Sequence, residues 1–325
     1  MHTLEPEQYT SPQQFSTELD AIFLSEWIVV AHTSEFPSYP FAIERTLNTH
    51  SIIIVATQEG FQAFRNICPH RAGPLLWEGE CTPLKALRCK YHGWRFDLKG
   101  AQTHSPDFGT EQHNQLQTIP IQIHKELIFI CFASTAPPFS WPQLLDTHAP
   151  DLRSFRIYKT ATHLLHCNWK TYVENYLEGY HIPYIHPSLR ASIQQSQYKI
   201  HINDTLITHE VPAKEDAPIS GFWAYMWPNT AINIYGSGMS IERILPIDAH
   251  HTQIHYLYLF EEDIPIEEKE AAIAMSREVT EEDILICNAV AKNLRSGQYQ
   301  KGPLSPKHEH GIWHVHNLIR KALTS

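Results

Sequence analysis

The chain of 325 residues lacks an apolar segment long enough to cross a membrane. A spanning helix needs about 20 consecutive apolar residues, whereas the best apolar run, Leu127 to Ala133, has the length of a strand. The start of the chain, Met1 to Gln8, also lacks the basic segment followed by an apolar one that typifies a signal peptide. We therefore expect a cytoplasmic protein without a membrane anchor.

Positive charge is in short supply. Lysine and arginine total 25 against 35 aspartates and glutamates, which gives a formal net charge of −10 at pH 7. A chain of this charge repels phosphate backbones and anionic lipid headgroups. We therefore expect neither nucleic acid nor a membrane surface as a partner.

Cysteine is sparse and histidine is abundant. The 6 cysteines are scattered and do not form the spacing pattern of a disulfide framework, which agrees with a reducing compartment. The 22 histidines make chance histidine spacings frequent. Only patterns of several residues therefore count as evidence for a site.

Hydrophobic periodicity divides the chain into regions of different character. A helical stripe follows Ser11-Pro12, short strand-like runs follow from about residue 41, and a proline-rich linker extends from Pro137 to Pro150. Beyond it we expect a helix from Asn168 to Tyr180, several strands from Ile200 to Phe260 and a helical tail from about Ile266 to Ser296, just after Pro265, which together indicate an α+β chain. The expected domains are an N-terminal helical segment that packs with the last domain, a mostly β domain, and an α+β domain: residues 1–40, 41–135 and 136–325.

Two Cys-His pairs form the first candidate metal site. Cys68-Pro69-His70 is followed after 18 residues by Cys89-Lys90-Tyr91-His92. A structural zinc site of two cysteines and two histidines is one interpretation, and coincidence in a histidine-rich chain is another. A gap of one residue in the first pair and two in the second favours a [2Fe-2S] cluster of the Rieske type, in which two histidines replace two cysteines on one iron.

A second candidate site surrounds His181 and His186. On a helix from about residue 168 to 180, Glu174, Glu178 and His181 share one face. We expect Pro183 to end or kink this helix, so that His186 folds back beside His181. Two imidazoles and one carboxylate form the facial triad that holds Fe²⁺ and leaves positions open for dioxygen. A pair of satisfied surface histidines is the alternative.

The surroundings of both motifs resemble the Rieske non-haem iron oxygenases, whose alpha subunits include aromatic ring-hydroxylating dioxygenases and choline monooxygenases. The resemblance rests on Asn66 to Gly73, Cys89 to Trp94 and Asn168 to His186, and it extends over nearly the whole chain. It implies a mostly β Rieske domain inserted in a catalytic domain with a curved antiparallel sheet flanked by helices. The implied cofactors are a [2Fe-2S] cluster and a mononuclear Fe²⁺.

The third iron ligand must come from elsewhere in the chain. We expect a helix to begin at Thr280, with Asp283 on the same face as Cys287, where an acid is costly unless a positive partner meets it. Thr280 and Asp283 also fit a variant of the capping box, which would give Asp283 a purely structural role. The family carries its iron aspartate after a glutamate in a late helix, so the resemblance implies Asp283, with Glu282 as the alternative.

The resemblance also implies a role for Glu178. In the family, the acid three residues before the first iron histidine bridges by hydrogen bonds to a cluster histidine of the neighbouring subunit. Glu178 takes this position, although direct ligation of the iron is a competing role. Asn175 is a candidate to assist near the iron, although solvation of the helix explains an asparagine at this position equally well. The resemblance further implies a head-to-tail homotrimer.

The substrate is less well defined than the cofactors. No flavin or nicotinamide fingerprint is present, so we expect electrons from a separate NAD(P)H-dependent reductase, directly or through a ferredoxin. The segment Trp223 to Asn229 is similar to choline monooxygenases, and its aromatic residues are suited to hold a quaternary ammonium or to fill a core. A betaine-like or aromatic compound would be hydroxylated or oxidatively demethylated, and Arg243 is a candidate partner for a substrate carboxylate. The alternatives are a Rieske electron carrier or redox sensor, and a zinc-stabilised binding protein.

Overall fold

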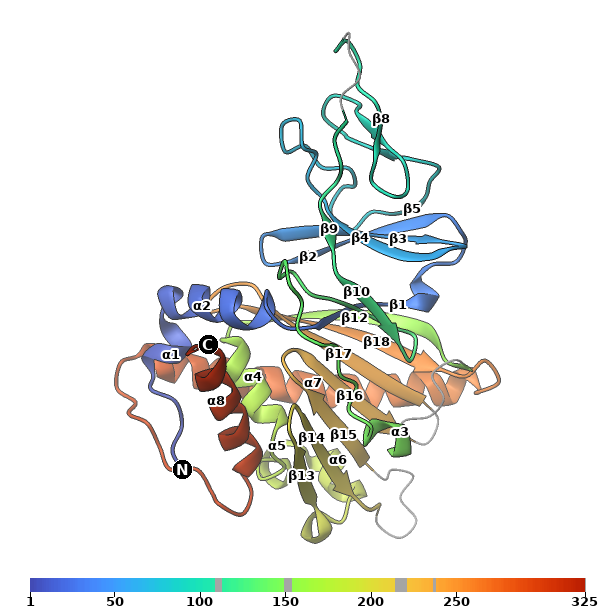
Figure 1. The fold of residues 1–325 in the computed structure, drawn as a ribbon. Coiled ribbons are helices and arrows are strands. Elements are labelled where there is room, and N and C mark those ends of the chain that lie inside the picture. Colours follow the sequence, from blue (N-terminus) through green and yellow to red (C-terminus); the bar gives the residue numbers. More distant parts are fainter. Residues whose placement is uncertain (109–112, 149–153, 214–220, 236–237, 325) are drawn as a thin grey trace. The chain divides into compact units, whose positions relative to one another are not determined.

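The computed structural model describes residues 1–108, 113–148, 154–213, 221–235 and 238–324. The chain divides into two compact units, Ser25–Phe139 and Met1–Leu24 with Ser140–Ser325 (Figure 1). The first unit is thus inserted in the sequence of the second, and the predicted α+β class with an inserted β-rich domain is confirmed. Among the described residues, no helix has the length and apolar character needed to cross a membrane.

Three antiparallel sheets make up the inserted unit. Their strand orders are β5-β2-β3-β4-β9, β6-β7-β8 and β1-β11-β10. Its core includes Phe64, Leu87 and Phe96, which are buried between the first two sheets and their loops. The strands are β1 (Ile28–His32), β2 (Phe41–Leu47), β3 (His50–Thr57), β4 (Gly60–Arg65), β5 (Cys81–Pro83), β6 (Leu87–Arg88), β7 (Arg95–Phe96), β8 (Gln102–His104), β9 (Thr118–Ile119), β10 (Ile121–His124) and β11 (Leu127–Ile130); the 3₁₀ helix η2 (Thr33–Glu35) follows β1.

The boundaries of the inserted unit differ from those expected at residues 40 and 135. Strand β1 pairs with β11, with Ile28 opposite Ile130, so residues 25–40 group with the β-rich unit. Pairing between segments about a hundred residues apart leaves no local signal in the sequence. The prolines from 137 to 142 lie at the second boundary, and Pro150 lies outside the described residues.

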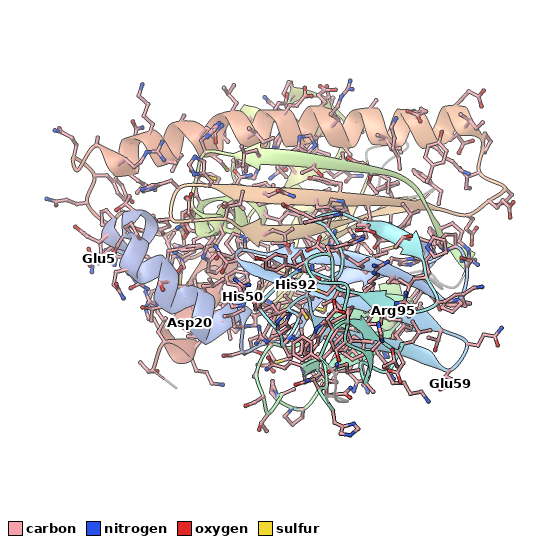
Figure 2. All side chains as sticks on the ribbon, turned by 90° about the horizontal axis from the view of Figure 1, so that it is seen from above. Glu5, Asp20, His50, Glu59, His92 and Arg95 are labelled. Atoms are coloured by element: carbon pink, nitrogen blue, oxygen red, sulfur yellow. The ribbon has the colours of Figure 1, made fainter. Side chains whose placement is uncertain are left out.

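The other unit is built on a seven-stranded antiparallel sheet. The strand order is β12-β18-β17-β16-β15-β14-β13. The long helix α7 runs along β12 and β18 (Figure 2). On β18, the Tyr256 hydroxyl forms a hydrogen bond with Thr280 of α7, and the Tyr258 hydroxyl forms one with Ser276. The elements are β12 (Arg156–Leu165), β13 (Lys199–Asn203), β14 (Leu206–Val211), β15 (Gly221–Met226), β16 (Thr230–Tyr235), β17 (Gly238–Pro246), β18 (Thr252–Phe260), α3 (Leu145–His148), α4 (Trp169–Tyr176), α5 (Ile182–Ile185), α6 (Pro187–Ser192), η4 (Gln195–Gln197), α7 (Ile266–Arg295) and α8 (His310–Ala322).

The N-terminal segment of this unit is anchored by a buried ion pair. It forms α1 (Glu7–Thr10), α2 (Pro12–Glu18), whose N-cap Ser11 accepts a hydrogen bond from the Gln14 amide, and the π-helical turn η1 (Leu19–Phe23). The Glu18 carboxylate accepts hydrogen bonds from the Lys170 ammonium and from Trp169 Nε1 on α4. The side chains of Lys170 and Glu18 are 1% and 0% exposed, so each charge depends on the other.

Replacing Glu18 with Gln should therefore destabilise the catalytic unit strongly. The change removes the carboxylate that is hydrogen-bonded to the buried Lys170 ammonium, and breaking a buried pair in this way costs about 3–5 kcal/mol. Glu270→Gln is the matched control, since the Lys159–Glu270 pair is 49% and 45% exposed and pairs of that kind contribute about 1 kcal/mol or less. Urea denaturation followed by circular dichroism measures both. Equal effects of the two substitutions would show that the buried pair is not an anchor.

Candidate metal centres

Three side chains converge on one point in the catalytic unit. The Nε2 atoms of His181 and His186 lie 3.1 Å apart. Asp283 Oδ1 lies 3.7 Å from His181 Nε2 and 3.1 Å from His186 Nε2. Among the described residues this is the one group of three or more histidine, cysteine or acidic side chains whose ligand atoms all lie within 4.8 Å of one another. Two imidazoles and one carboxylate are the ligand set that the sequence predicted for Fe²⁺.

A single helical turn brings the two histidines together. His181 precedes α5 and His186 follows it, and the amide of His186 donates to the carbonyl of Ile182. The predicted helix through residue 180 is wrong, because α4 ends at Tyr176. Pro183 does not terminate that helix; it sits in the first turn of α5, where its missing N–H costs nothing.

Asp283 comes from the interior of α7. The helical tail expected from about Ile266 to Ser296 is confirmed, because α7 spans 30 residues from Ile266 to Arg295. The narrower expectation that a helix begins at Thr280 is therefore wrong. Thr280 donates its hydroxyl to the carbonyl of Ser276 within this helix, so it is not an N-cap. The capping interpretation of Asp283 is thereby overturned. The segment from residue 267 to 274 is rich in Glu and Ala and contains neither Pro nor Gly, which agrees with the start at Ile266.

Each histidine of the group is paired with a carboxylate through its other ring nitrogen. His181 Nδ1 lies 2.5 Å from Glu178 Oε1, and His186 Nδ1 lies 2.7 Å from Glu282 Oε2. With Nδ1–H donating to an acid, each ring presents the lone pair of Nε2 to the centre. Glu282, the alternative third ligand, therefore lies behind His186 and not at the centre. The sequence reasoning missed this partnership.

The charges around His186 change its proton affinity. Burial alone lowers the pKa of an imidazole, but hydrogen bonds and negative charge from Asp283 and Glu282 outweigh it, and the pKa of His186 is raised. A bound cation would replace the proton in satisfying these acids. The site is therefore built to take up positive charge.

The flanking residues of α4 have different contacts. Asn175 Nδ2 donates to Asp283 Oδ1 over 2.6 Å, which fixes the carboxylate from the side opposite α7. Glu174, expected on the same face as Glu178, points away instead. It accepts hydrogen bonds from the Tyr9 hydroxyl at 2.6 Å and His316 Nε2 at 2.8 Å. Glu174 thus joins both ends of the chain to α4.

In the inserted unit, the two Cys-His loops lie against each other. The thiols of Cys68 and Cys89 are buried and in contact, and the ring centroids of His70 and His92 are 4.7 Å apart. The Lys90 amide donates to the Pro74 carbonyl and ties the loops together. Figure 2 labels His92 within this unit. Burial, together with the neighbouring Cys89 thiol, raises the pKa of Cys68 to about 11, so a cation is needed to hold it as a thiolate.

Unsatisfied atoms in these loops fit an iron–sulfur cluster. The Nδ1 atoms of His70 and His92 are buried and have no hydrogen-bond partner among the described residues. The four donors do not gather within 4.8 Å of one another, which favours a two-iron cluster over a single tetrahedral zinc. A Cβ at Gly73 would lie 2.9 Å from Cys89 Sγ, so only glycine allows this approach of the loops.

A cavity of about 630 Å³ borders the histidine–aspartate centre. Its walls are mostly apolar and aromatic, and the rings of Trp223 and Tyr198 are stacked with their centroids 6.2 Å apart. Of the aromatic segment expected to face substrate, Trp223 lines the cavity, whereas Tyr225 and Trp227 are buried elsewhere. Arg243 is not among the lining residues; its guanidinium lies 2.8 Å from His255 Nδ1. The aromatic lining residues are Tyr172, Tyr176, Tyr198, Trp223, Tyr235 and Tyr256.

Comparisons with known proteins agree with both centres. A family model described as "Ring hydroxylating alpha subunit (catalytic domain)" matches residues 151–213 and 205–325, and one described as "Rieske [2Fe-2S] domain" matches residues 26–120. The carnitine monooxygenase oxygenase subunit of Escherichia coli (strain K12) is 29% identical over 98% of this chain and 92% of that protein. The chloroplastic choline monooxygenase of Amaranthus tricolor is 26% identical over 97% and 76%. The crystal structure of the quaternary ammonium Rieske monooxygenase CntA with an inhibitor superposes with a TM-score of 0.91 at 25% identity, over 99% of this chain and 95% of that one.

The different places of Asp283 and Glu282 predict different effects on metal binding. Asp283→Ala removes a ligand and should abolish Fe²⁺ binding at this centre. Glu282→Gln removes only the acid behind His186 and should weaken binding about 10–100-fold. Anaerobic Fe²⁺ titration, with iron measured against acid-labile sulfide, separates the two. Glu281→Gln is the control, because that side chain is 65% exposed. A larger loss of iron in Glu282→Gln than in Asp283→Ala would contradict the assignment.

Proposed function

The chain belongs to the family of ring-hydroxylating oxygenase alpha subunits with a Rieske domain, and from this premise we propose that it oxidises a small quaternary ammonium compound with dioxygen. It is a Rieske non-haem iron oxygenase, with a [2Fe-2S] cluster and a mononuclear iron at His181, His186 and Asp283. An electron carrier, a redox sensor or a zinc-stabilised binding protein would not need this catalytic domain. The cavity beside the iron carries the proposal about the substrate.

The lining of this cavity suits a cation. Its described residues include four acids and neither lysine nor arginine; the acids are Glu178, Glu242, Glu268 and Asp283. An aromatic carboxylate would enter without a basic partner, which is costly away from water. A methylated ammonium against the faces of Trp223 and Tyr198 gains about 0.5–2 kcal/mol for each ring. Relatives named for carnitine and choline agree with this choice.

A polar part of the substrate also has a candidate partner. The Tyr235 hydroxyl is buried at the cavity and has no hydrogen-bond partner among the described residues. Burial raises the pKa of Tyr235, so the phenol keeps its proton and can donate it to a substrate hydroxyl or carboxylate. Choline, carnitine and glycine betaine each offer such a group. The cavity therefore has complementary partners for both ends of these molecules.

We propose that Cys68, His70, Cys89 and His92 hold the cluster, with the histidines bound through Nδ1. When bound, the two cofactors supply electron delivery and dioxygen activation. The chain's own residues hold the site in shape: Glu178 and Glu282 retain the Nδ1 protons of the iron histidines, and Asn175 holds the Asp283 carboxylate. The aromatic walls exclude water from the reacting substrate.

Electrons come, in this proposal, from a separate NAD(P)H-dependent reductase, directly or through a ferredoxin. The related carnitine enzyme is itself named an oxygenase subunit. We further propose a head-to-tail homotrimer in which Glu178 bridges to a cluster histidine of the neighbouring subunit. Large exposed aromatics beside each centre support partner surfaces there: Tyr91 is 56% exposed, Tyr180 50% and Tyr184 79%. A cytoplasmic location is supported by six free cysteines, five of them buried.

The function is tested by oxygen uptake. With iron restored, a surrogate reductase and NADH, we expect choline, carnitine or glycine betaine to stimulate oxygen consumption and benzoate to have no effect. His181→Ala should abolish this turnover and leave the visible and EPR spectra of the cluster unchanged, because the two centres are in separate units. Stimulation by aromatic acids alone would refute the substrate class. Loss of the cluster spectrum in His181→Ala would refute the separation of the centres.

Mixed trimers test the path of the electrons. His92→Ala and His181→Ala should each be inactive alone. Co-expressed chains should regain roughly a quarter of wild-type turnover, because a randomly mixed ring places an intact cluster beside the intact iron of its neighbour at roughly a quarter of its subunit junctions. Glu178→Gln added to the His92→Ala chain should abolish the rescue. The same Glu178→Gln change in the His181→Ala chain, which lacks the mononuclear iron, should leave the rescue of activity intact. Mixed trimers without activity would mean that electrons stay within one chain.

A further inference from the structure

Glu242 is a buried acid at the cavity that the metal centre does not use. It lies on β17, is 3% exposed and contributes to the cavity wall. Its Oε2 accepts a hydrogen bond from the Tyr172 hydroxyl at 2.6 Å, and its Oε1 accepts one from Asn233 Nδ2 at 2.6 Å. These neutral donors hold the carboxylate in one position without neutralising its charge.

No lysine or arginine compensates this charge among the described lining residues. Arg243 follows directly in the strand, and successive side chains of a strand point to opposite faces; its guanidinium lies against His255. Burial raises the pKa of Glu242 to about 6, against the opposing effect of hydrogen bonds from Tyr172, Asn233 and Tyr256. The group is therefore mostly ionised at neutral pH, although buried acids are as a rule paired with a positive group.

We propose that Glu242 is the counter-ion of the substrate and selects for a cation by pairing with its ammonium group. This proposal rests on the proposed function and adds the residue that discriminates by charge. The carboxylate borders the same cavity as Trp223 and Tyr235, so one substrate can meet the aromatic walls and the acid together. Attraction between opposite charges is strong in such a site, where little water screens it.

A purely structural role for Glu242 makes a different prediction. An acid that only holds Tyr172 and Asn233 in place would serve any substrate of the same shape, whatever its charge. A counter-ion serves only the cation. The comparison of a cation with a neutral molecule of the same shape therefore distinguishes the two roles.

The test uses choline and 3,3-dimethyl-1-butanol, in which carbon replaces the nitrogen. Dissociation constants are measured by calorimetry on the iron-loaded enzyme. We expect wild-type protein to prefer choline, and Glu242→Gln to weaken choline binding about 30-fold while the neutral alcohol changes by less than about threefold. Glu281→Gln is the matched control, since Glu281 is an acid of helix α7 that is 65% exposed and is not among the residues lining the cavity. It should leave both constants unchanged.

The other outcomes separate the two proposals. If Glu242→Gln weakens both ligands equally or neither, Glu242 is not the counter-ion, whereas choline binding by the wild type still supports the proposed function. If wild-type protein prefers the neutral alcohol, both the proposed cationic substrate and the role of Glu242 as its counter-ion are refuted. The cluster absorption and melting temperature monitor folding. Glu242→Asp, which keeps the charge, should keep the preference for choline even if Glu242→Gln does not fold; loss of that preference in a folded Glu242→Asp would count against the pairing.

Discussion

The pairing of each iron histidine with a carboxylate is the interaction on which the catalytic centre depends. A free imidazole can present either nitrogen and can rotate about its side-chain bonds, so two histidines near each other do not by themselves make a metal site. Glu178 and Glu282 remove this freedom by holding the Nδ1 protons. Asn175 does the same for the Asp283 carboxylate. The ligand set is thus oriented by residues from α4, the loop before α5, and α7.

Negative charge is the second organising feature of this unit. The acids that orient the histidines and line the cavity bring several carboxylates into a small volume, and no described lysine or arginine of the lining balances them. A divalent cation, and the cationic substrate that we propose, would each lower the cost of this arrangement. In this proposal, metal affinity and substrate selectivity have a common electrostatic origin in the cavity.

The sequence predicted the chemistry better than the geometry. The cysteine and histidine of each Cys-His pair are only a few residues apart, and so are His181 and His186. Short-range spacing in the sequence was therefore sufficient to identify them. The long helix after Pro265 was predicted from about Ile266 and is confirmed as α7, whereas the helix expected through residue 180 ends at Tyr176 and the start expected at Thr280 lies inside α7. The partnership of Glu282 with His186 joins residues 96 positions apart. Glu242 carries no local sequence signal, because its hydrogen-bond partner Tyr172 lies 70 positions away in the chain.

Helix α7 contributes both an iron ligand and part of the cavity wall. Met275 and Val279 line the cavity, and Asp283 follows Val279 by one helical turn on the same continuous rod. The wall of the cavity and a ligand of the iron centre therefore share one short stretch of helical backbone, and the position of Asp283 is tied to the packing of Val279.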